Sequence, residues 1–120
     1  MRKHNAETLI EEGPDFVRDF MRVKHSKDEF EPEFSWLMLL ELADFECGVA
    51  SETDLALARK WADVAILLYQ KLIRKLRPQD DMMRDSWTRR IETLRTWPPM
   101  PSASTPGIGT PTPINEPQRV

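Results

Sequence analysis

Three acidic residues interrupt an apolar stretch near the middle of the chain, and they are the first candidates for chemistry. Glu41 and Asp44 are three residues apart, so they share a face if the stretch is helical, and Glu46 follows closely. Di-metal helical bundles use carboxylates in this way but also need a Glu-x-x-His motif, which this sequence lacks. We therefore expect the acids to face solvent, to pair with basic residues, or, for one of them, to be buried against an arginine. The basic candidates are Arg59, Lys60 and Arg90.

One cysteine and two histidines are the other groups that could catalyse a reaction or bind a metal. Cys47 ends the apolar stretch, where a thiol is more often a packed side chain than a nucleophile. His4 lies near the first residue, and we expect His25 to face solvent at the end of a helix. These three residues cannot complete a zinc site without several carboxylates. The sequence therefore predicts no metal, no cofactor and no enzymatic activity.

Basic residues gather in the second half of the chain. Residues 1–58 contain 6 Lys and Arg against 14 Asp and Glu, whereas residues 59–97 contain 10 against 5. This asymmetry would let the two halves of the fold attract one another, or it would present a basic surface to a partner. Basic side chains near Trp87 and Trp97 could also hold phosphates and stack on bases. The candidate residues for binding a partner or nucleic acid are Lys71, Arg74, Lys75, Arg77, Arg84, Arg89, Arg90 and Arg95.

The longest helical pattern spans residues 51–77 and forms the centre of the predicted fold. It contains neither Gly nor Pro, and its apolar residues recur at spacings of three and four. We expect Ser51 to cap its first turn and Pro78 to end it. The preceding segment, residues 34–47, is apolar almost all round, and Gly48 suits a left-handed helix end. The short link between the two segments predicts an antiparallel helical hairpin.

Shorter helices are expected on both sides of this hairpin. Residues 6–12 predict a first helix, residues 15–25 predict a second, and residues 26–33 predict a loop with one turn. The last helix is expected at residues 80–97, packed back on the hairpin. Its predicted inner face consists of Met83, Trp87, Ile91 and Leu94. These patterns predict an all-α domain, a small bundle of four to five helices, over residues 1–97.

Residues 98–120 differ in composition from the rest of the chain. Seven of the ten prolines lie in this segment, and its apolar residues follow no period. Such a segment cannot bury enough apolar surface to offset the entropy lost on ordering. We predict a disordered Pro/Ser/Thr-rich tail that serves as a spacer or as a short polyproline-type ligand.

Composition narrows the setting in which the protein works. The net charge is −3, and the longest purely apolar run, residues 36–40, is far too short to cross a membrane. A single cysteine excludes a disulfide within the chain and favours a reducing compartment. We therefore expect an intracellular, cytoplasmic protein that does not bind membranes, located in the host cell if it is viral.

The large number of aromatic and methionine residues favours a role in binding other proteins. Four Trp, five Phe and six Met are more than a small bundle is expected to bury, and the remainder would form an interface. We predict a non-enzymatic helical protein–protein interaction module, such as an adaptor, inhibitor or assembly factor, that binds a partner or itself as a homodimer. This profile is common among accessory proteins of viruses and phages, although no motif identifies a family. The alternative is a nucleic-acid-binding protein that uses the basic face of residues 71–95.

Overall fold

The computed structural model describes residues 3–99, which form five α-helices and one turn of 3-10 helix. The elements are α1 (Ala6–Glu12), α2 (Pro14–Met21), the turn Lys27–Glu29, α3 (Trp36–Ala50), α4 (Leu55–Ile73) and α5 (Asp81–Arg95). One isolated β-bridge, between His4 and Phe30, accompanies them in this part of the chain. The predicted all-α fold is confirmed. All but the first two residues of the predicted disordered tail lie outside the described residues.

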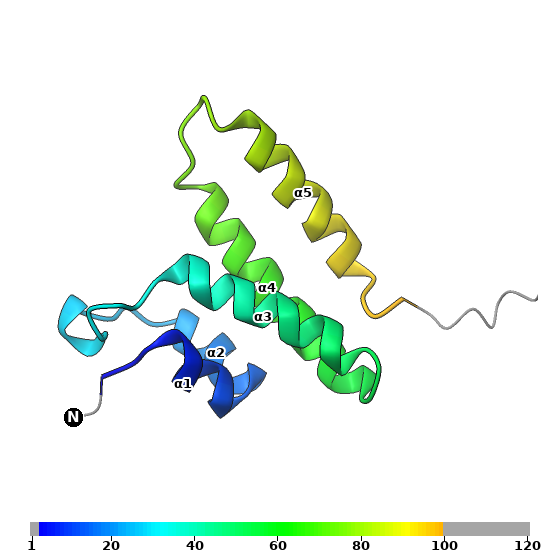
Figure 1. The fold of residues 1–120 in the computed structure, drawn as a ribbon, viewed down its shortest axis with the longest axis horizontal. Helices are drawn as coiled ribbons and strands as arrows, with labels where there is room; N and C mark the ends of the chain where they lie inside the picture. Colours follow the sequence, from blue (N-terminus) through cyan, green and yellow to red (C-terminus); the bar gives the residue numbers. More distant parts are fainter. Residues whose placement is uncertain (1–2, 100–120) are drawn as a thin grey trace, which may run out of the picture.

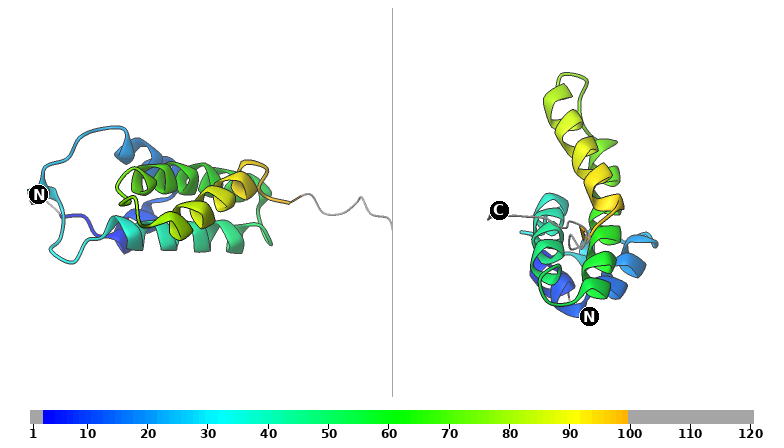
Figure 2. Two further views of the ribbon diagram at one scale, coloured as in Figure 1. Left: turned by 90° about the horizontal axis from the view of Figure 1, so that it is seen from above. Right: turned by 90° about the vertical axis from the view of Figure 1, so that its right-hand side faces the viewer.

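Helices α3 and α4 form the predicted hairpin at the centre of the molecule (Figure 1). Helix α1 packs on α3 and α2 packs on α4, so both lie on the same side of the hairpin. Helix α5 lies on the other side, as the two further views show (Figure 2). We predicted that the last helix would pack on both members of the hairpin. Its backbone lies against α4, and it contacts α3 through the ion pair between Arg90 and Asp44.

The link between α3 and α4 differs from the prediction. Helix α3 continues through Gly48 to Ala50, and the Ser51 hydroxyl donates a hydrogen bond back to the Gly48 carbonyl at 2.7 Å. Ser51 therefore ends α3 and does not begin α4. Asp54 caps α4 because its carboxylate accepts the backbone N–H of Leu57 at 3.1 Å. Two residues in this region can act as a cap, and the sequence pattern alone did not distinguish them.

The bounds of α2 and the end of α4 also differ from the prediction. Helix α2 begins at Pro14, which suits the first helical turn, and it ends at Met21 before reaching His25. Helix α4 ends at Ile73, and the expected extension to Arg77 is replaced by tighter turns. Asp80 accepts the backbone N–H of Arg77 at 3.0 Å, which stabilises the turn that leads into α5.

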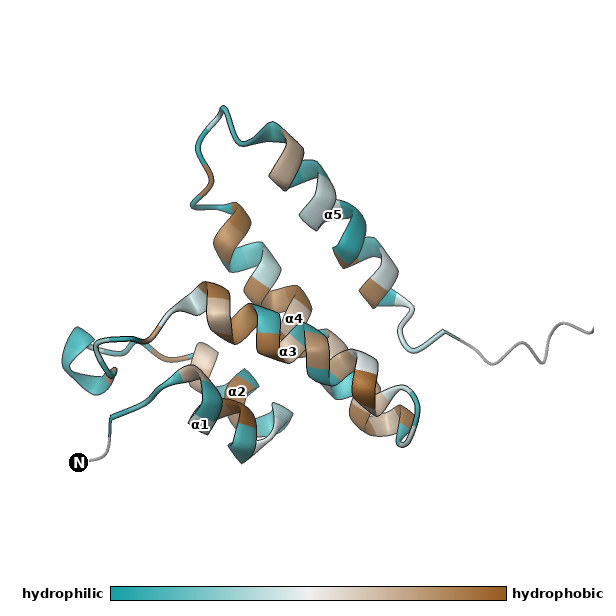
Figure 3. Ribbon diagram, viewed as in Figure 1, coloured by the Kyte–Doolittle hydropathy of each residue, from teal (hydrophilic) through white to brown (hydrophobic). Residues whose placement is uncertain are grey.

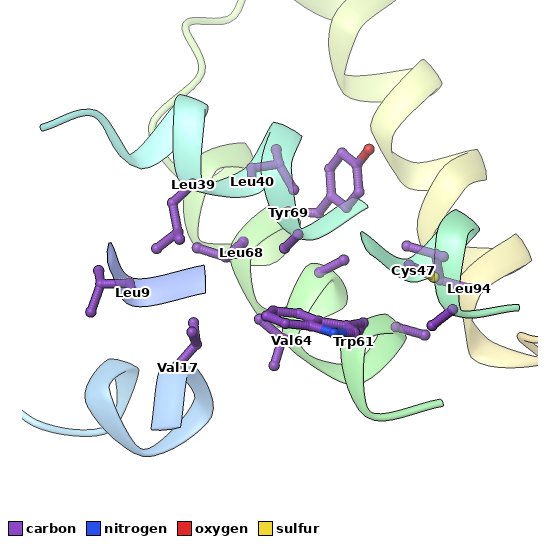
Figure 4. Packing of buried hydrophobic residues seen from close by; sticks show 14 of the residues in the cluster. Leu9, Val17, Leu39, Leu40, Cys47, Trp61, Val64, Leu68, Tyr69 and Leu94 are labelled. Carbon is purple, nitrogen blue, oxygen red and sulfur yellow. The ribbon is translucent and has the colours of Figure 1, made fainter. Parts of the chain in front are cut away.

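The core is built around α4, which contacts neighbours on both sides of the hairpin (Figure 4). Ala58, Ala62 and Ala65 are fully buried, and their small side chains let α3 and α4 approach closely. Helix α5 contributes only Ile91 and Leu94 as buried residues. Figure 3 shows that α3 is largely hydrophobic whereas α5 is largely hydrophilic.

Candidate functional site

Helices α3, α4 and α5 surround an open hollow of about 600 Å3. It exists because the backbone of α5 packs on α4 and not on α3, so that α5 reaches α3 on that side only through side chains. We call this hollow and its lining the α3–α5 groove. The lining residues are Leu37, Leu40, Glu41, Asp44, Phe45, Tyr69, Met83, Trp87 and Arg90. A hollow of this volume falls within the range of about 300–1,000 Å3 that is typical of ligand-binding pockets.

The α3 side of the groove is an exposed stripe with a spacing of four residues. Leu37 is 45% exposed and Phe45 is 65% exposed, with the exposed Glu41 between them. Because α3 is apolar almost all round, α1 and α4 cannot cover every side of it. The stripe therefore leaves apolar surface in contact with solvent.

The α5 side of the groove corrects part of the predicted inner face. Met83 is 48% exposed, because the first turns of α5 diverge from the hairpin (Figure 1). Trp87 lies deeper and meets the Tyr69 ring edge to face, with ring centroids 5.8 Å apart. Ile91 and Leu94 are buried as predicted. Helices α3 and α5 thus diverge toward the N-terminal end of α5 (Figure 1).

A half-buried polar cluster joins α3 to α5 across the groove. The Arg90 guanidinium donates to both carboxylate oxygens of Asp44, at 2.6 and 3.0 Å, and the Tyr69 hydroxyl donates to the same carboxylate at 2.6 Å. Burial opposes the charge on Asp44, but the hydrogen bonds from Arg90 and Tyr69 outweigh it and lower the pKa of the carboxyl below its ordinary value of 3.8. Burial and the neighbouring carboxylate raise the pKa of Tyr69, which favours its role as a donor. The predicted pairing of one acid with Arg90 is confirmed.

Trp97, just beyond α5, contacts both α3 and the groove residue Arg90. Its indole N–H donates to the Cys47 carbonyl at 3.0 Å, and the Arg90 guanidinium lies 5.2 Å from its ring centroid. Arg59 of α4 donates to the carbonyls of Arg95 and Trp97 at 2.8 and 2.9 Å. These contacts fix the C-terminal end of α5 to both α3 and α4.

Asp44→Asn is expected to reduce the acid sensitivity of the fold. In the native protein the pKa of Asp44 lies below its unfolded value, so its charge stabilises the fold above about pH 4 and this contribution is lost as the pH falls through the native pKa. The wild type should therefore lose more unfolding free energy between pH 7 and pH 3 than the variant does. Urea unfolding at the two pH values measures this difference.

Asp85→Asn is the matched control, because Asp85 is an exposed residue of α5 without an ion pair among the described residues. It should show the same acid sensitivity as the wild type. An Asp44→Asn protein with unchanged acid sensitivity would mean that the Asp44–Arg90 pair does not stabilise the fold.

The candidate catalytic groups lie in places that do not favour catalysis. Cys47 is fully buried, and burial together with the Asp44 charge raises the pKa of its thiol to about 11. A thiol with that pKa is protonated at neutral pH and is a poor nucleophile. His25 is not solvent-facing as expected. Its ring stacks on Phe20 at 3.9 Å and forms hydrogen bonds with Phe20 and Glu29, because the loop after α2 folds back over it.

The structure separates the eight predicted basic residues into several groups. Arg90 belongs to the groove, while Arg77 and Arg84 pair with Asp80 and Asp81 at 3.4 and 2.9 Å. Arg89 and Arg95 are exposed on α5. The continuous basic face predicted over residues 71–95 is therefore divided among separate contacts.

Lys71, Arg74 and Lys75 remain together at the end of α4, and Arg22, which directly follows α2, joins Lys71 and Arg74 around a hollow of about 260 Å3. We call these four residues the α2–α4 basic cluster. The Lys71 ammonium lies 4.6 Å from the ring centroid of Trp36. Burial and the charges of Lys75 and Arg74 lower the pKa of Lys71, as expected for cations held close together. Sequence reasoning missed Arg22, which only the packing of α2 on α4 brings to this place.

Neither the described residues nor comparisons with known proteins identify a biochemical class. Within residues 3–99, no group of three or more His, Cys, Asp or Glu is arranged to hold a metal ion. No helix in this part of the chain has both the length and the apolar character that crossing a membrane requires. The sequence matches no protein-family model, no curated protein and no solved structure. The groove is therefore the feature on which a function is argued.

Proposed function

We propose that this chain is a non-enzymatic protein-interaction module that binds a partner protein in the α3–α5 groove. The observation that carries the proposal is the exposure of Phe45, Leu37 and Met83 around one hollow. Large apolar side chains that are exposed singly need no explanation, but a contiguous group around a concave surface is typical of a binding site. An adaptor, an inhibitor or an assembly factor would each use such a surface, as would an accessory protein of a virus.

The energetics favour a protein partner over a small polar ligand. Full burial of a side chain such as Phe, Leu or Met stabilises a complex by about 1.5–3 kcal/mol. More than half of the Phe45 side chain and almost half of Leu37 and Met83 are still exposed to water. Aromatic residues, methionine and arginine are enriched at the centres of protein interfaces, and Phe45, Met83 and Arg90 are of these types. The groove thus has the composition of an interface centre with a polar edge.

Site-specific photocrosslinking tests the proposal. A photoreactive phenylalanine analogue at position 45 should form a crosslink to a partner in a lysate of the source organism, because this side chain extends from the rim of the groove. The analogue at position 92, on the exposed face of α5, is the matched control and should not capture the same protein.

Adding Met83→Ser to the position-45 probe should reduce the yield of that crosslink, whereas Met82→Ser should not. Met82 is 87% exposed and does not line the groove. Identical capture from positions 45 and 92 would contradict the proposal. A crosslink from position 45 to a second copy of the chain would indicate the homodimer instead.

A second candidate function is nucleic-acid binding by the α2–α4 basic cluster. The observation that favours it is the convergence of Arg22, Lys71 and Arg74 on one hollow, beside the exposed Lys75. The structure gives Lys71, Arg74 and Lys75 no ion pair with the carboxylates of residues 3–99. Unneutralised cations of this kind bind phosphates and release counterions.

A salt titration with labelled single-stranded RNA and duplex DNA tests this second candidate. Binding should weaken steeply as salt rises, and Arg74→Glu with Lys75→Glu should abolish it because two of the four cations of the cluster are reversed. Arg89→Glu with Arg95→Glu is the control, since these exposed arginines lie on α5 away from the cluster. Equal losses in the two double variants would point to general charge attraction, and salt-independent binding would exclude this candidate.

A further inference from the structure

The α3–α5 groove has the shape of a helix bundle with one member missing. Helices α3 and α5 flank it, and Tyr69 of α4 lies at its base. The Asp44–Arg90 pair links the two flanking helices, which diverge from each other toward the N-terminal end of α5 (Figure 1). Helices that pack against each other lie about 8–10 Å apart, and a fourth helix in the groove would contact three neighbours. A helix therefore fits the groove better than a compact small molecule does.

Backbone chemistry also favours a helix over an extended segment. The walls of the groove are side chains of helices, whose backbone N–H and C=O groups are already paired within each helix. An extended segment would place its own backbone polar groups against Leu37, Phe45 and Met83, which cannot pair with them. A helix satisfies its own backbone and presents only side chains to the groove.

Glu41 indicates what one of those side chains must be. It lies on α3 between Leu37 and Phe45, it is exposed, and it forms no ion pair within the described residues. A purely apolar helix would cover this carboxylate and leave it desolvated without a partner, which opposes binding. An occupant with a cation at this position would remove the penalty and gain a charge-assisted hydrogen bond.

A second copy of this chain does not provide that cation through the same surface. Among the described residues, Arg90 is the only basic residue that lines the groove, and its Nε and Nη2 groups already donate to the two carboxylate oxygens of Asp44. In a two-fold dimer the same surface of both copies forms the interface. Glu41 would then face Leu37, Phe45 or Arg90 of the other copy, and that Arg90 is already paired with Asp44. The groove is therefore better suited to a different protein.

We infer that the occupant of the α3–α5 groove is an amphipathic helix of a partner protein, with a lysine or arginine that pairs with Glu41. Apolar residues three or four positions before and after that cation pack against Leu37 and Phe45. This inference rests on the proposed function and deepens it by stating the chemistry of the partner segment.

Selection from a helical-peptide library tests the inference without knowledge of the partner. The library has an Ala-rich helical frame with Leu, Met or Phe on one face, and one position within that face varies among Lys, Arg, Gln and Glu. The full chain is immobilised as the wild type, as Glu41→Lys, and as the control Glu92→Lys. Glu92 is exposed on α5 and does not line the groove.

Lys and Arg should be enriched over Glu by roughly tenfold on the wild type, which corresponds to about 1.4 kcal/mol. Glu41→Lys should reverse that preference, and Glu92→Lys should leave it unchanged. Phe45→Ser should reduce the capture of all peptides. Capture of helices with no dependence on the charge at position 41 would overturn this inference while leaving the proposed function in place.

Two further results would also overturn the inference. One is sedimentation equilibrium showing a dimer that Phe45→Ser dissociates, since a second copy would then fill the groove. The other is displacement of the selected helices by a synthetic peptide of residues 100–120, which would make this chain's own C-terminal segment the occupant. Failure of every library helix to bind, alongside a position-45 crosslink to a partner protein, would reject the helix and retain the proposed function.

Discussion

Ala62→Asp is expected to unfold the domain. Ala62 is fully buried on α4, and its small side chain lies in the tightly packed part of the core. An aspartate there would carry a charge, or bind a proton, without a hydrogen-bonding partner, at a cost of several kcal/mol. Because a domain of this size is stable by only about 5–15 kcal/mol, that cost is a large part of the total. Circular dichroism and urea unfolding should show loss of the cooperative transition.

Ala56→Asp is the matched control for this change. Ala56 lies on the same helix, but it is exposed in the first turn, where a negative charge is compatible with the helix dipole. The control should stay within about 0.5 kcal/mol of the wild type. If Ala62→Asp were as stable as Ala56→Asp, the orientation of α4 described here would be wrong.

Leu94→Ala is expected to detach α5 from the rest of the fold. Leu94 is fully buried and is one of two buried residues on this helix, the other being Ile91. Removing a buried leucine side chain costs about 2–5 kcal/mol. The backbone amides of α5 should therefore lose protection in hydrogen exchange, and the unfolding free energy should fall by a similar amount.

The control for α5 is Met82→Ala, which removes a side chain that is 87% exposed. It should leave both the unfolding free energy and the exchange of α5 amides nearly unchanged. Equal protection of α5 in the Leu94→Ala and Met82→Ala proteins would contradict the packing of α5 on α4. Such a result would also remove one wall of the proposed binding groove.

The sequence was sufficient to predict the helices and the hairpin because periodicity and caps are local properties. The predicted boundary between α3 and α4 was wrong because Ser51 and Asp54 are both good caps. Only the folded link shows that the Ser51 hydroxyl donates a hydrogen bond to the Gly48 carbonyl. The exposure of Met83 was also missed, since its spacing from Trp87 is that of an inner face. Spacing gives the face of a helix but not the angle at which that helix leaves its neighbour.

The shape of the groove depends on that angle. The sequence could therefore predict which types of residue form the groove but not its shape. The excess of large apolar residues predicted exposed surface, and the pairing of an acid with Arg90 was one of the stated alternatives. Phe45 and Glu41 lie on an exposed stripe because the backbone of α5 packs on α4, and α5 reaches α3 through side chains such as Arg90. The spacing of four from Leu37 through Glu41 to Phe45 did indicate that these residues share one face of the helix. That signal is weak in a helix that is apolar on almost every side.

The central position of the α3–α4 hairpin means that binding on one side can be measured on the other. Helices α1 and α2 pack on the hairpin opposite α5, so both sides share one core. A partner that binds only the native groove raises the free energy of unfolding by about 2.7 kcal/mol when its concentration is one hundred times Kd. Helix α1 does not line the groove. Slower amide exchange in α1 would thus show that the groove is occupied, although α1 does not contact the bound partner.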